Sequence, residues 1–407
     1  MINSIRYLCI ALLATFFTPS CASDPRSNVP AAADGAAQPD GAYVIPDTIE
    51  LPRPTGPFTI VRGQRRTLID PSRDLEGNAL HADAGTLDGG NAEAGPTRPL
   101  SLEIWYPSDT PGSGATVAYM DKAEAASLDT PAFVDHVRTH SYANRPFASS
   151  LTVAPVLLFS PGYNVQPRLY TVFIEEAVSR GYIVVAMSHT LWTPVTTFAD
   201  GSTINMTHGV DDSDSAVLYA VGVWLTDARF VLDELVKIAS SDPYAEIAGH
   251  VDLTKVGMFG HSFGGATSIG MLVTDARVLA AIDFDGSIYG NGATQSFSKP
   301  VFIFQEPMQD STMNNTFNNA AGIAFHAVLA NSLHFNFSDL GIITSILLKP
   351  SLWQSNMLGT IDPVRGVQEV NGYAQAFFDF ALKGTPNPLL EGPAAQYPDV
   401  VNFSKKP

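Results

Sequence analysis

Residues 260–264 read Gly-His-Ser-Phe-Gly, a Gly-x-Ser-x-Gly motif with Ser262 at its centre. Where this motif joins a β-strand to an α-helix, the serine stands on a sharp turn and can act as the nucleophile of acyl transfer. The turn crowds the positions two before and two after the serine, and Gly260 and Gly264 have no Cβ that would clash there. The alternative interpretation is a Gly-rich turn in which Ser262 caps the following helix.

A serine hydroxyl is a weak nucleophile, so the same chemistry requires a general base and a carboxylate that orients the base. The expected chain order is Ser, then acid, then His, and His326 and His334 are the histidines that follow Ser262. His326 lies within the apolar run 324–331, which predicts a strand, and we interpret it as a structural strand residue. His334 follows that strand, where a loop can reach back over the sheet, and it is the candidate base.

Two carboxylates, Asp283 and Asp285, lie at the end of the apolar run 278–285. The period of two in a strand places both side chains on one face, so strand geometry does not separate them. Asp285 is nearer the end of the strand and precedes Gly286, and we select it as the acid. Asp283 is interpreted as structural, pairing with a loop.

Stabilisation of a tetrahedral oxyanion requires two backbone N–H donors near the serine. The first is expected from Phe263, directly after the serine. The second is expected from the loop after the apolar run 155–160, most simply from Tyr163. Gly162, just before it, lets that backbone approach the substrate. Four aromatic residues near these segments are candidates to line an acyl pocket: Trp192, Phe198, Phe335 and Phe337.

These groups need a scaffold that brings distant segments together, and strand-like and helix-like runs alternate along the chain. The alternation predicts an α/β fold with a mostly parallel sheet and helices on both faces, and ligands bind at the carboxyl ends of such strands. The first two strands are expected to form an antiparallel hairpin at the sheet edge, with Leu100, Leu102, Ile104 and Tyr106 on one face. Strands are predicted over 58–69, 99–107, 155–160, 182–187, 255–259, 278–285, 300–304 and 324–331, the last in the sheet, and helices over 168–180, 214–240, 266–273 and 371–383, the last with Asn371 as N-cap and Gly384 as its stop.

The composition bounds the classes of function. The chain has 407 residues, 45% of them hydrophobic, and a formal net charge of −17. Such a surface argues against nucleic acids and against simple electrostatic docking on anionic membranes as partners. No His/Cys spacing suggests zinc, and the acidic segment Asp211–Asp214 is interpreted as a solvated helix start and not as a calcium site. No cofactor or metal is expected.

The N-terminus predicts export from the cytoplasm. Arg6 precedes a short apolar run ending at Phe17, typical of a secretory signal. Cleavage after Ala22 fits a small-x-small site, and Cys21 ends a degenerate lipobox that would make it a lipid anchor to a membrane. The expected organisation is a signal at 1–22, a flexible Ala-, Pro-, Asp- and Gly-rich linker at 23–54, and a catalytic domain at 55–407. The protein is therefore expected to be secreted, periplasmic or lipid-anchored.

Three segments resemble the lipoprotein-associated platelet-activating-factor acetylhydrolases. Residues 251–267 are similar to the serine turn of that family, which places its acid 23 residues after the serine, as 285 − 262 = 23 here. Residues 334–339, His-Phe-Asn-Phe-Ser-Asp, match the family's His-x-Asn-Phe-x-Asp segment, and residues 159–163 resemble its oxyanion strand. The resemblance runs from about Phe58 to Lys383. It implies Asp285 and His334 as the partners of the serine, with backbone donors at Phe263 and Tyr163.

Membership would imply the α/β-hydrolase fold and hydrolysis of short or oxidised sn-2 acyl chains from phospholipids, so the expected partner is a small or lipid ester. Pro161 and Tyr163 depart from the family's usual His and Leu, which leaves the shape of the acyl pocket open. Similar bacterial sequences include general short-chain esterases and polyester hydrolases. The remaining alternative is a non-catalytic surface protein with the same fold, which the presence of the serine, the acid and the histidine disfavours.

Overall fold

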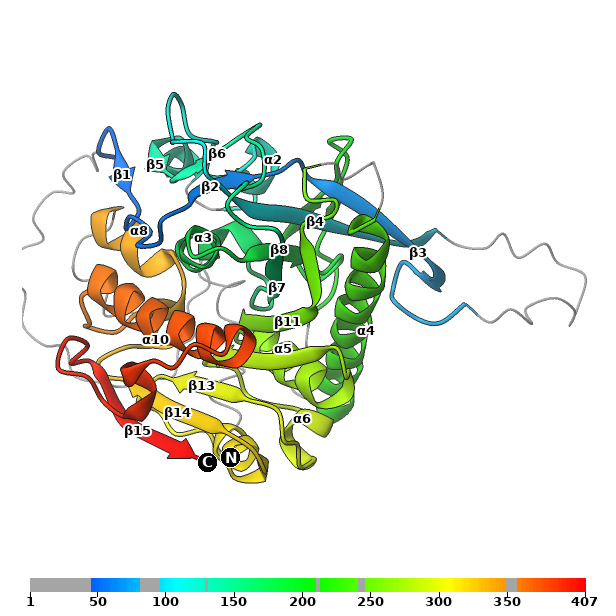
Figure 1. The fold of residues 1–407 in the computed structure, drawn as a ribbon. Helices are drawn as coiled ribbons and strands as arrows, with labels where there is room; N and C mark the ends of the chain where they lie inside the picture. The colour runs from blue at the N-terminus through cyan, green and yellow to red at the C-terminus, as the bar shows by residue number, and fades with distance from the viewer. Residues whose placement is uncertain (1–44, 81–95, 129–130, 210–212, 241–245, 348–356) are drawn as a thin grey trace, which may run out of the picture.

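The computed structural model describes residues 45–80, 96–128, 131–209, 213–240, 246–347 and 357–407. Their central feature is an 11-stranded sheet with the order β15-β14-β13-β12-β11-β7-β8-β4-β2-β6 and with β3 paired to β4 (Figure 1). From β14 to β8 all neighbouring strands run parallel. The parallel strands are β7 (Ala154–Ser160), β8 (Ile183–Ser188), β11 (Val251–His261), β12 (Val278–Phe284), β13 (Val301–Gln305) and β14 (Ala324–Leu329).

Antiparallel strands flank this parallel centre. On one side β4 (Thr97–Ser108) pairs with β8, and β2 (Thr59–Arg62) and β3 (Arg66–Asp74) pair with β4. The single strand predicted over 58–69 is therefore two strands, interrupted at residues 63–65. The predicted face of β4 is confirmed, because Leu100, Leu102, Ile104 and Tyr106 belong to one core cluster. The smaller strands are β1 (Ile49–Glu50), β5 (Val137–Arg138), β6 (Ser141–Tyr142), β9 (Val195–Thr197) and β10 (Thr203–Asn205).

Helices cover both faces of the sheet, which confirms the predicted α/β class (Figure 1). One core cluster joins β-strand side chains to α4 (Asp214–Ile238) and α5 (Phe263–Thr274). A second cluster joins the opposite face to α3 (Thr171–Ser179), α8 (Leu340–Leu347) and α10 (Pro363–Lys383). The shorter helices are α2 (Lys122–Ala125), α6 (Asn291–Thr294) and α7 (Ser311–Asn319), with 3-10 turns η1 (Pro131–His136), η2 (Pro167–Tyr170), η4 (His334–Phe337) and η5 (Pro388–Glu391).

The C-terminal part of the chain differs from the prediction in two ways. Helix α10 begins at Pro363, where the Asp362 side chain accepts the Arg365 N–H, so Asn371 is not its N-cap. Asn371 lies within the helix, and its Nδ2 donates to the carbonyl of Val172, 3.1 Å away. The stop at Gly384 is confirmed by its left-handed φ of 69°. The sheet also continues beyond β14, because β15 (Val400–Lys406) pairs with it in the antiparallel direction.

The predicted linker at 23–54 ends earlier than expected. Residues 49–50 form β1, which pairs in parallel with β5, and Ile49 and Leu51 are buried in the core. The burial of these apolar side chains anchors the segment, so residues 49–51 belong to the folded domain. The predicted signal at 1–22 and the proposed lipid site at Cys21 lie outside the described residues.

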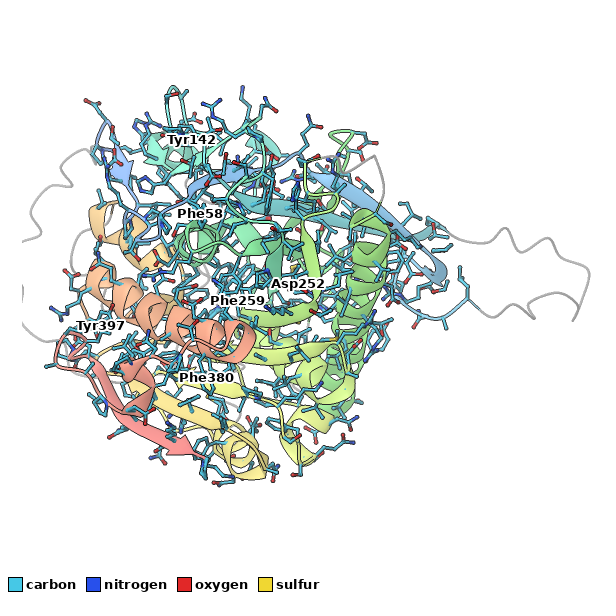
Figure 2. All side chains as sticks on the ribbon, in the orientation of Figure 1. Phe58, Tyr142, Asp252, Phe259, Phe380 and Tyr397 are labelled. Atoms are coloured by element: carbon cyan, nitrogen blue, oxygen red, sulfur yellow. The ribbon has the colours of Figure 1, made fainter. Side chains whose placement is uncertain are left out.

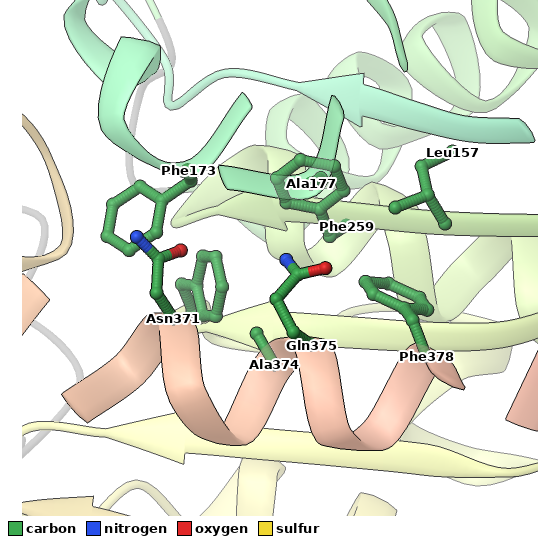
Figure 3. Close-up of a pocket in the computed structure, with 9 residues that line it drawn as sticks. Leu157, Phe173, Ala177, Phe259, Asn371, Ala374, Gln375 and Phe378 are labelled. Atoms are coloured by element: carbon green, nitrogen blue, oxygen red, sulfur yellow. The ribbon is translucent and has the colours of Figure 1, made fainter. Parts of the chain in front are cut away.

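A narrow gap between side chains lies between the sheet and helices α3 and α10 (Figure 3). Phe259 of β11 lines it from the sheet, in the middle of the packed side chains (Figure 2). Its other lining residues are Leu157, Phe173, Ala177, Phe284, Asn371, Ala374, Gln375 and Phe378. None of the candidate catalytic residues lines this space, so it is a feature of core packing and not a substrate pocket.

Two buried carboxyl groups, those of Glu175 and Asp339, have raised pKa values. Glu175 of α3 accepts the His140 N–H at 2.8 Å and the Ser141 hydroxyl at 2.6 Å. Burial raises the pKa of Glu175 from 4.5 to about 7, and burial likewise raises the pKa of Asp339 to about 7. The folded state therefore keeps protons that the unfolded state releases between about pH 4.5 and pH 7.

Replacing Glu175 with glutamine is expected to flatten the dependence of stability on pH. Because the folded-state pKa is raised, the free energy of unfolding falls as pH rises through about 7, and the neutral amide removes this contribution. The loss of stability between pH 5 and pH 8 should shrink by about 1–3 kcal/mol. Urea unfolding at both pH values measures it, with Glu391→Gln on the surface as the control. An unchanged loss in Glu175→Gln would contradict the assignment.

Candidate active site

Ser262 stands on the turn between β11 and α5, in a strained backbone conformation with φ 57° and ψ −122°. A non-glycine residue in this region costs on the order of 1–3 kcal/mol, and such strain clusters at functional sites. Ser262 occupies the N-cap position of α5, but its side chain makes no capping hydrogen bond to the helix. The hydroxyl is left available for another role.

The two motif glycines are required by close backbone packing, as the sequence predicted. A Cβ on Gly260 would lie 2.4 Å from the backbone of Gly264. A Cβ on Gly264 would lie 2.1 Å from the carbonyl oxygen of Ser160 and 2.3 Å from that of Pro161. The serine turn is thus pressed against the end of β7, where the predicted oxyanion loop begins.

Asp285 and His334, predicted as acid and base, are directly bonded. The His334 Nδ1–H donates to Asp285 Oδ2 across 2.6 Å, and the Glu306 N–H donates to Oδ1 across 2.9 Å. The Asp285 side chain is fully buried, whereas the His334 side chain is 22% exposed. A buried carboxylate with an imidazole at the surface is the arrangement of an orienting acid and a general base.

The predicted ambiguity between the two carboxylates is resolved by the backbone. Asp285 has φ 55°, so it leaves the strand conformation and the alternation of faces stops at Phe284. Asp283 remains in β12, where its Oδ1 accepts the Gly286 N–H at 2.9 Å. Asp283 is therefore structural and bonds to a loop, as predicted.

Hydrogen bonds of the main chain hold Ser262 beside this pair. The Ser262 N–H donates to the carbonyl of Phe284, next to Asp285, across 2.8 Å. On the other side, the ring of His261 lies 4.4 Å, centroid to centroid, from the ring of His334. The structure thus brings the three predicted catalytic residues to one edge of the sheet. His326 is elsewhere, in β14 opposite Ser404, as its structural interpretation predicts.

The two predicted oxyanion donors lie on adjacent segments. Phe263 is the first residue of α5, where backbone N–H groups have no partner within the helix. Tyr163 follows β7 in the loop against which Gly264 packs, and its side chain shares a core cluster with that of Phe263. The Tyr163 hydroxyl donates to the carbonyl of His208 at 2.9 Å, which ties the oxyanion loop to the segment after β10.

A family model described as platelet-activating factor acetylhydrolase, isoform II, matches residues 232–384, the part of the chain that contains Ser262, Asp285 and His334. The chain is similar to that family over those residues. The match begins within α4 and ends just after α10, so it covers the C-terminal half of the sheet and the serine turn.

Two curated relatives and one solved structure illustrate the family's neighbours. A protein of Arthroderma benhamiae, named as a probable 1-alkyl-2-acetylglycerophosphocholine esterase, is 28% identical over 61% of this chain and 65% of its own length. The platelet-activating factor acetylhydrolase of Cavia porcellus is 24% identical over 55% of this chain and 56% of its own length. The chain therefore matches less than two thirds of either relative. A ferulic acid esterase from Streptomyces cinnamoneus has a similar fold with a TM-score of 0.72 and 27% identity, covering 86% of this chain and 98% of that one.

The chain contains a second Ser-His-Asp set, which sequence reasoning missed. His189 Nδ1–H donates to Asp227 Oδ2 at 2.9 Å, and the Ser160 hydroxyl lies 2.9 Å from His189 Nε2. All three residues have 0% exposure, so none can contact a substrate. Arg98 and Arg73 hold Asp227 from the opposite side at 2.7 Å each. This set is a structural network beneath the end of β7.

The sequence carried a faint signal for that network. Ser160 ends one predicted strand and His189 follows the next, so both stand at the carboxyl edge of the sheet, but Asp227 lies in the middle of a helix. All three precede Ser262 in the chain, outside the expected order of a triad. Burial lowers the pKa of His189, which keeps the imidazole neutral beside its carboxylate.

The predicted acyl-pocket aromatics are more buried than such a role requires. Phe337 is fully buried and packs on Phe284, and Trp192 is 1% exposed with its ring against His208. Phe335 and Phe198 are also buried. These residues support the site from beneath, and Phe337 in particular belongs to the core.

The described residues contain no group of three or more His, Cys, Asp or Glu side chains placed to hold a metal ion. Asp211 and Asp212, half of the acidic segment considered for calcium, lie outside the described residues. Helix α4 is long and apolar enough to cross a membrane, but half of its most apolar window is buried within the protein. Its apolar side chains pack on the sheet, which explains their composition.

Proposed function

We propose that this chain is a serine carboxylic ester hydrolase that works through an acyl-enzyme. The observation that supports it most is the 2.6 Å bond between His334 and the buried Asp285, beside a serine held at φ 57°. In this proposal Ser262 is the nucleophile, His334 the general acid and base, and Asp285 the orienting acid. The names of the relatives, all esterases or acetylhydrolases, support the same reaction class.

The reaction divides into two half-reactions. Ser262 Oγ attacks the ester carbonyl while His334 Nε2 takes the hydroxyl proton, and the Phe263 and Tyr163 N–H groups stabilise the oxyanion. Collapse expels the alcohol, which receives the proton from His334 and leaves an acyl ester on Ser262. Water then attacks the acyl-enzyme with His334 again as base, and a second collapse releases the acid and the free serine.

The tautomer of His334 follows from its partners. Asp285 is buried and accepts the Glu306 N–H on one oxygen, so its other oxygen is fixed to accept Nδ1–H from the imidazole. Nε2 then carries a lone pair, as a base requires. The imidazolium formed in each half-reaction is stabilised by the same carboxylate.

The proposed substrates are phospholipids with short or oxidised sn-2 acyl chains. The support is the similarity to the family and the printed activity of the Arthroderma benhamiae relative. A second candidate is a general short-chain or aromatic esterase, including activity on polyesters. The similarity to the ferulic acid esterase favours this second candidate. It extends over 98% of that enzyme, whereas the similarity to the two curated relatives extends over 65% and 56% of their lengths.

A panel of esters separates the two candidates. We expect hydrolysis of p-nitrophenyl acetate, a fall of about tenfold or more toward decanoate, and turnover of a phospholipid with an oxidised sn-2 chain at a kcat/KM above that of methyl ferulate. The reverse order would favour the aromatic esterase. Folded protein that turns over no ester and resists a fluorophosphonate probe would support the non-catalytic alternative.

The proposed location is outside the cytoplasm, either free or anchored by a lipid on Cys21. It rests on Arg6 and the apolar run that follows it. The mass of the mature N-terminus distinguishes the two forms, because cleavage after Ala22 removes the cysteine and lipidation retains it with an added acyl mass.

A further inference from the structure

A continuous line of hydrogen bonds joins the oxyanion loop to the loop of the proposed base. The Gly162 N–H donates to the Tyr170 hydroxyl oxygen at 3.1 Å. Tyr170 Oη lies 2.8 Å from His261 Nδ1, and His261 Nε2 lies 2.9 Å from the carbonyl oxygen of His334. Tyr170 and His261 both have 0% exposure, so water does not compete for these bonds.

The directions of these bonds follow from the two backbone ends together with burial. An amide N–H can only donate and a carbonyl can only accept, so the Tyr170 oxygen accepts from Gly162, and His261 Nε2 donates its ring proton to His334. Burial lowers the pKa of His261 well below its usual value, so the imidazole is neutral and its Nδ1 accepts the Tyr170 proton.

We propose that Tyr170 and His261 are positioning residues. Their hydrogen bonds hold the backbone of the oxyanion donor at Tyr163 and the backbone of the base at His334 in fixed positions relative to Ser262. Gly162 directly precedes the proposed donor, and His261 directly precedes the proposed nucleophile. The line thus passes through all three functional segments. This inference rests on the proposed function, because it assigns those three segments to one reaction.

Packing leaves the line little room to move. A Cβ on Gly162 would lie 3.0 Å from Tyr170 Oη and 3.1 Å from His261 Nδ1, so the absence of a side chain at Gly162 leaves room for the Tyr170–His261 hydrogen bond. The Tyr170 ring packs on Phe159 with centroids 5.0 Å apart, and the His261 ring packs on Phe335 at 5.8 Å. Loss of one bond is therefore expected to displace a backbone segment and not merely a side chain.

The first test removes the hydroxyl of Tyr170. We expect Tyr170→Phe to lower kcat for p-nitrophenyl acetate about 10- to 100-fold with KM changed less than about threefold, since small displacements of reacting groups cost this much. Tyr182→Phe is the matched control. Tyr182 is also 0% exposed, and its hydroxyl donates a 2.8 Å hydrogen bond to Asp379. Tyr182 directly precedes β8, so it lies at the end of the parallel strands opposite to the proposed active site. An equal kcat in both variants would overturn the proposal.

The second test divides the line at its centre. His261→Asn retains an acceptor near Nδ1 for Tyr170 and loses the donor to His334, whereas His261→Gln retains a donor near Nε2 and loses that acceptor. We expect the Gln variant to lose affinity for a trifluoromethyl ketone, which forms the tetrahedral adduct, and the Asn variant to change the pH profile of kcat. Tyr170→Phe with His261→Gln should cost about as much as Tyr170→Phe alone, because the loss of the Tyr170 hydroxyl already breaks the bond that His261→Gln removes. Full multiplicative losses would overturn the proposal.

A readout besides turnover separates this inference from the proposed function. In the wild type, the His261 ring N–H should appear in proton NMR as a slowly exchanging resonance, assigned by its absence in His261→Asn. It should exchange faster in Tyr170→Phe and not in Tyr182→Phe. Inactive wild-type protein that shows this pattern would refute both the esterase and the positioning role, and would leave these hydrogen bonds as a structural network. Active wild-type protein without the pattern would refute the line alone.

Discussion

Replacing Ser262 with alanine is expected to lower kcat for p-nitrophenyl acetate by on the order of 10⁴- to 10⁶-fold. The substitution removes only the hydroxyl group, which makes no capping hydrogen bond to α5, so the stability of the folded protein should change little. The strained φ of 57° is unchanged by alanine, which suffers the same steric cost as serine. Single-turnover hydrolysis, circular dichroism and thermal unfolding measure activity and fold together. Turnover within tenfold of the wild type would refute Ser262 as nucleophile.

The second Ser-His-Asp set supplies a matched control for this experiment. Ser160→Ala makes the same change in a serine that also lies next to a histidine, but Ser160 is fully buried. We expect Ser160→Ala to keep kcat within about tenfold and to lose roughly 1–3 kcal/mol of stability, because His189 Nε2 is left without its donor. Loss of activity in Ser160→Ala with retention in Ser262→Ala would reverse the two assignments.

The local parts of the site could be predicted because each is a short pattern with one physical cause. Gly260 and Gly264 are glycine because the turn at Ser262 leaves less than 3 Å for a Cβ, and that requirement is visible in the motif itself. The order of serine, acid and histidine follows from the order of parallel strands, so the positions of Asp285 and His334 could be read from the ends of apolar runs.

Other parts of the site depend on contacts that no local pattern encodes. His261 occupies a variable position of the motif, yet it bonds to Tyr170, 91 residues away in the chain. Asp227 has the periodicity of an ordinary helix and gains its role from Arg98, 129 residues away. Period-two reasoning could not separate Asp283 from Asp285 because the left-handed φ of Asp285 ends the alternation.

The misjudged boundaries have a similar origin. The start of α10 was placed at Asn371, because asparagine is a good cap, but Asp362 followed by Pro363 gives an earlier start that is also sound. Asn371 is tolerated inside the helix because the carbonyl of Val172 accepts from its amide. Composition marked 23–54 as a linker, whereas Ile49 and Leu51 are buried through β1.

The carboxyl end of β7 is held from two sides, and this explains how one strand can serve the oxyanion. Ser160 bonds to His189 on one side, and Gly162 bonds to Tyr170 on the other. An oxyanion hole works when its donors are fixed before the charge develops. The two buried networks both end beside the proposed oxyanion loop, and of the two the bond from Gly162 lies next to the proposed donor at Tyr163.

Replacing Asp285 with asparagine is expected to lower kcat by on the order of 10⁴-fold. The Glu306 N–H binds Oδ1, so the amide must place its NH₂ toward His334 to keep that bond. The imidazole would then accept at Nδ1 and carry its proton on Nε2, where it cannot remove the proton of Ser262. The basic-side plateau of kcat/KM should also begin at a lower pH, because an imidazole without the carboxylate is a weaker base. Steady-state kinetics from pH 5 to 9 measure both effects.

Asp283→Asn is the control that makes this result specific. Asp283 lies two residues earlier and is equally buried, and its Oδ1 accepts the backbone N–H of Gly286, a bond that an asparagine oxygen can also accept. We expect a loss of activity of less than about tenfold in Asp283→Asn. Because both variants remove one buried negative charge from the same strand end, a large difference between them can arise only from the bond to His334. Equal losses in the two variants would mean that the charge at this edge, and not the orientation of the imidazole, supports the reaction.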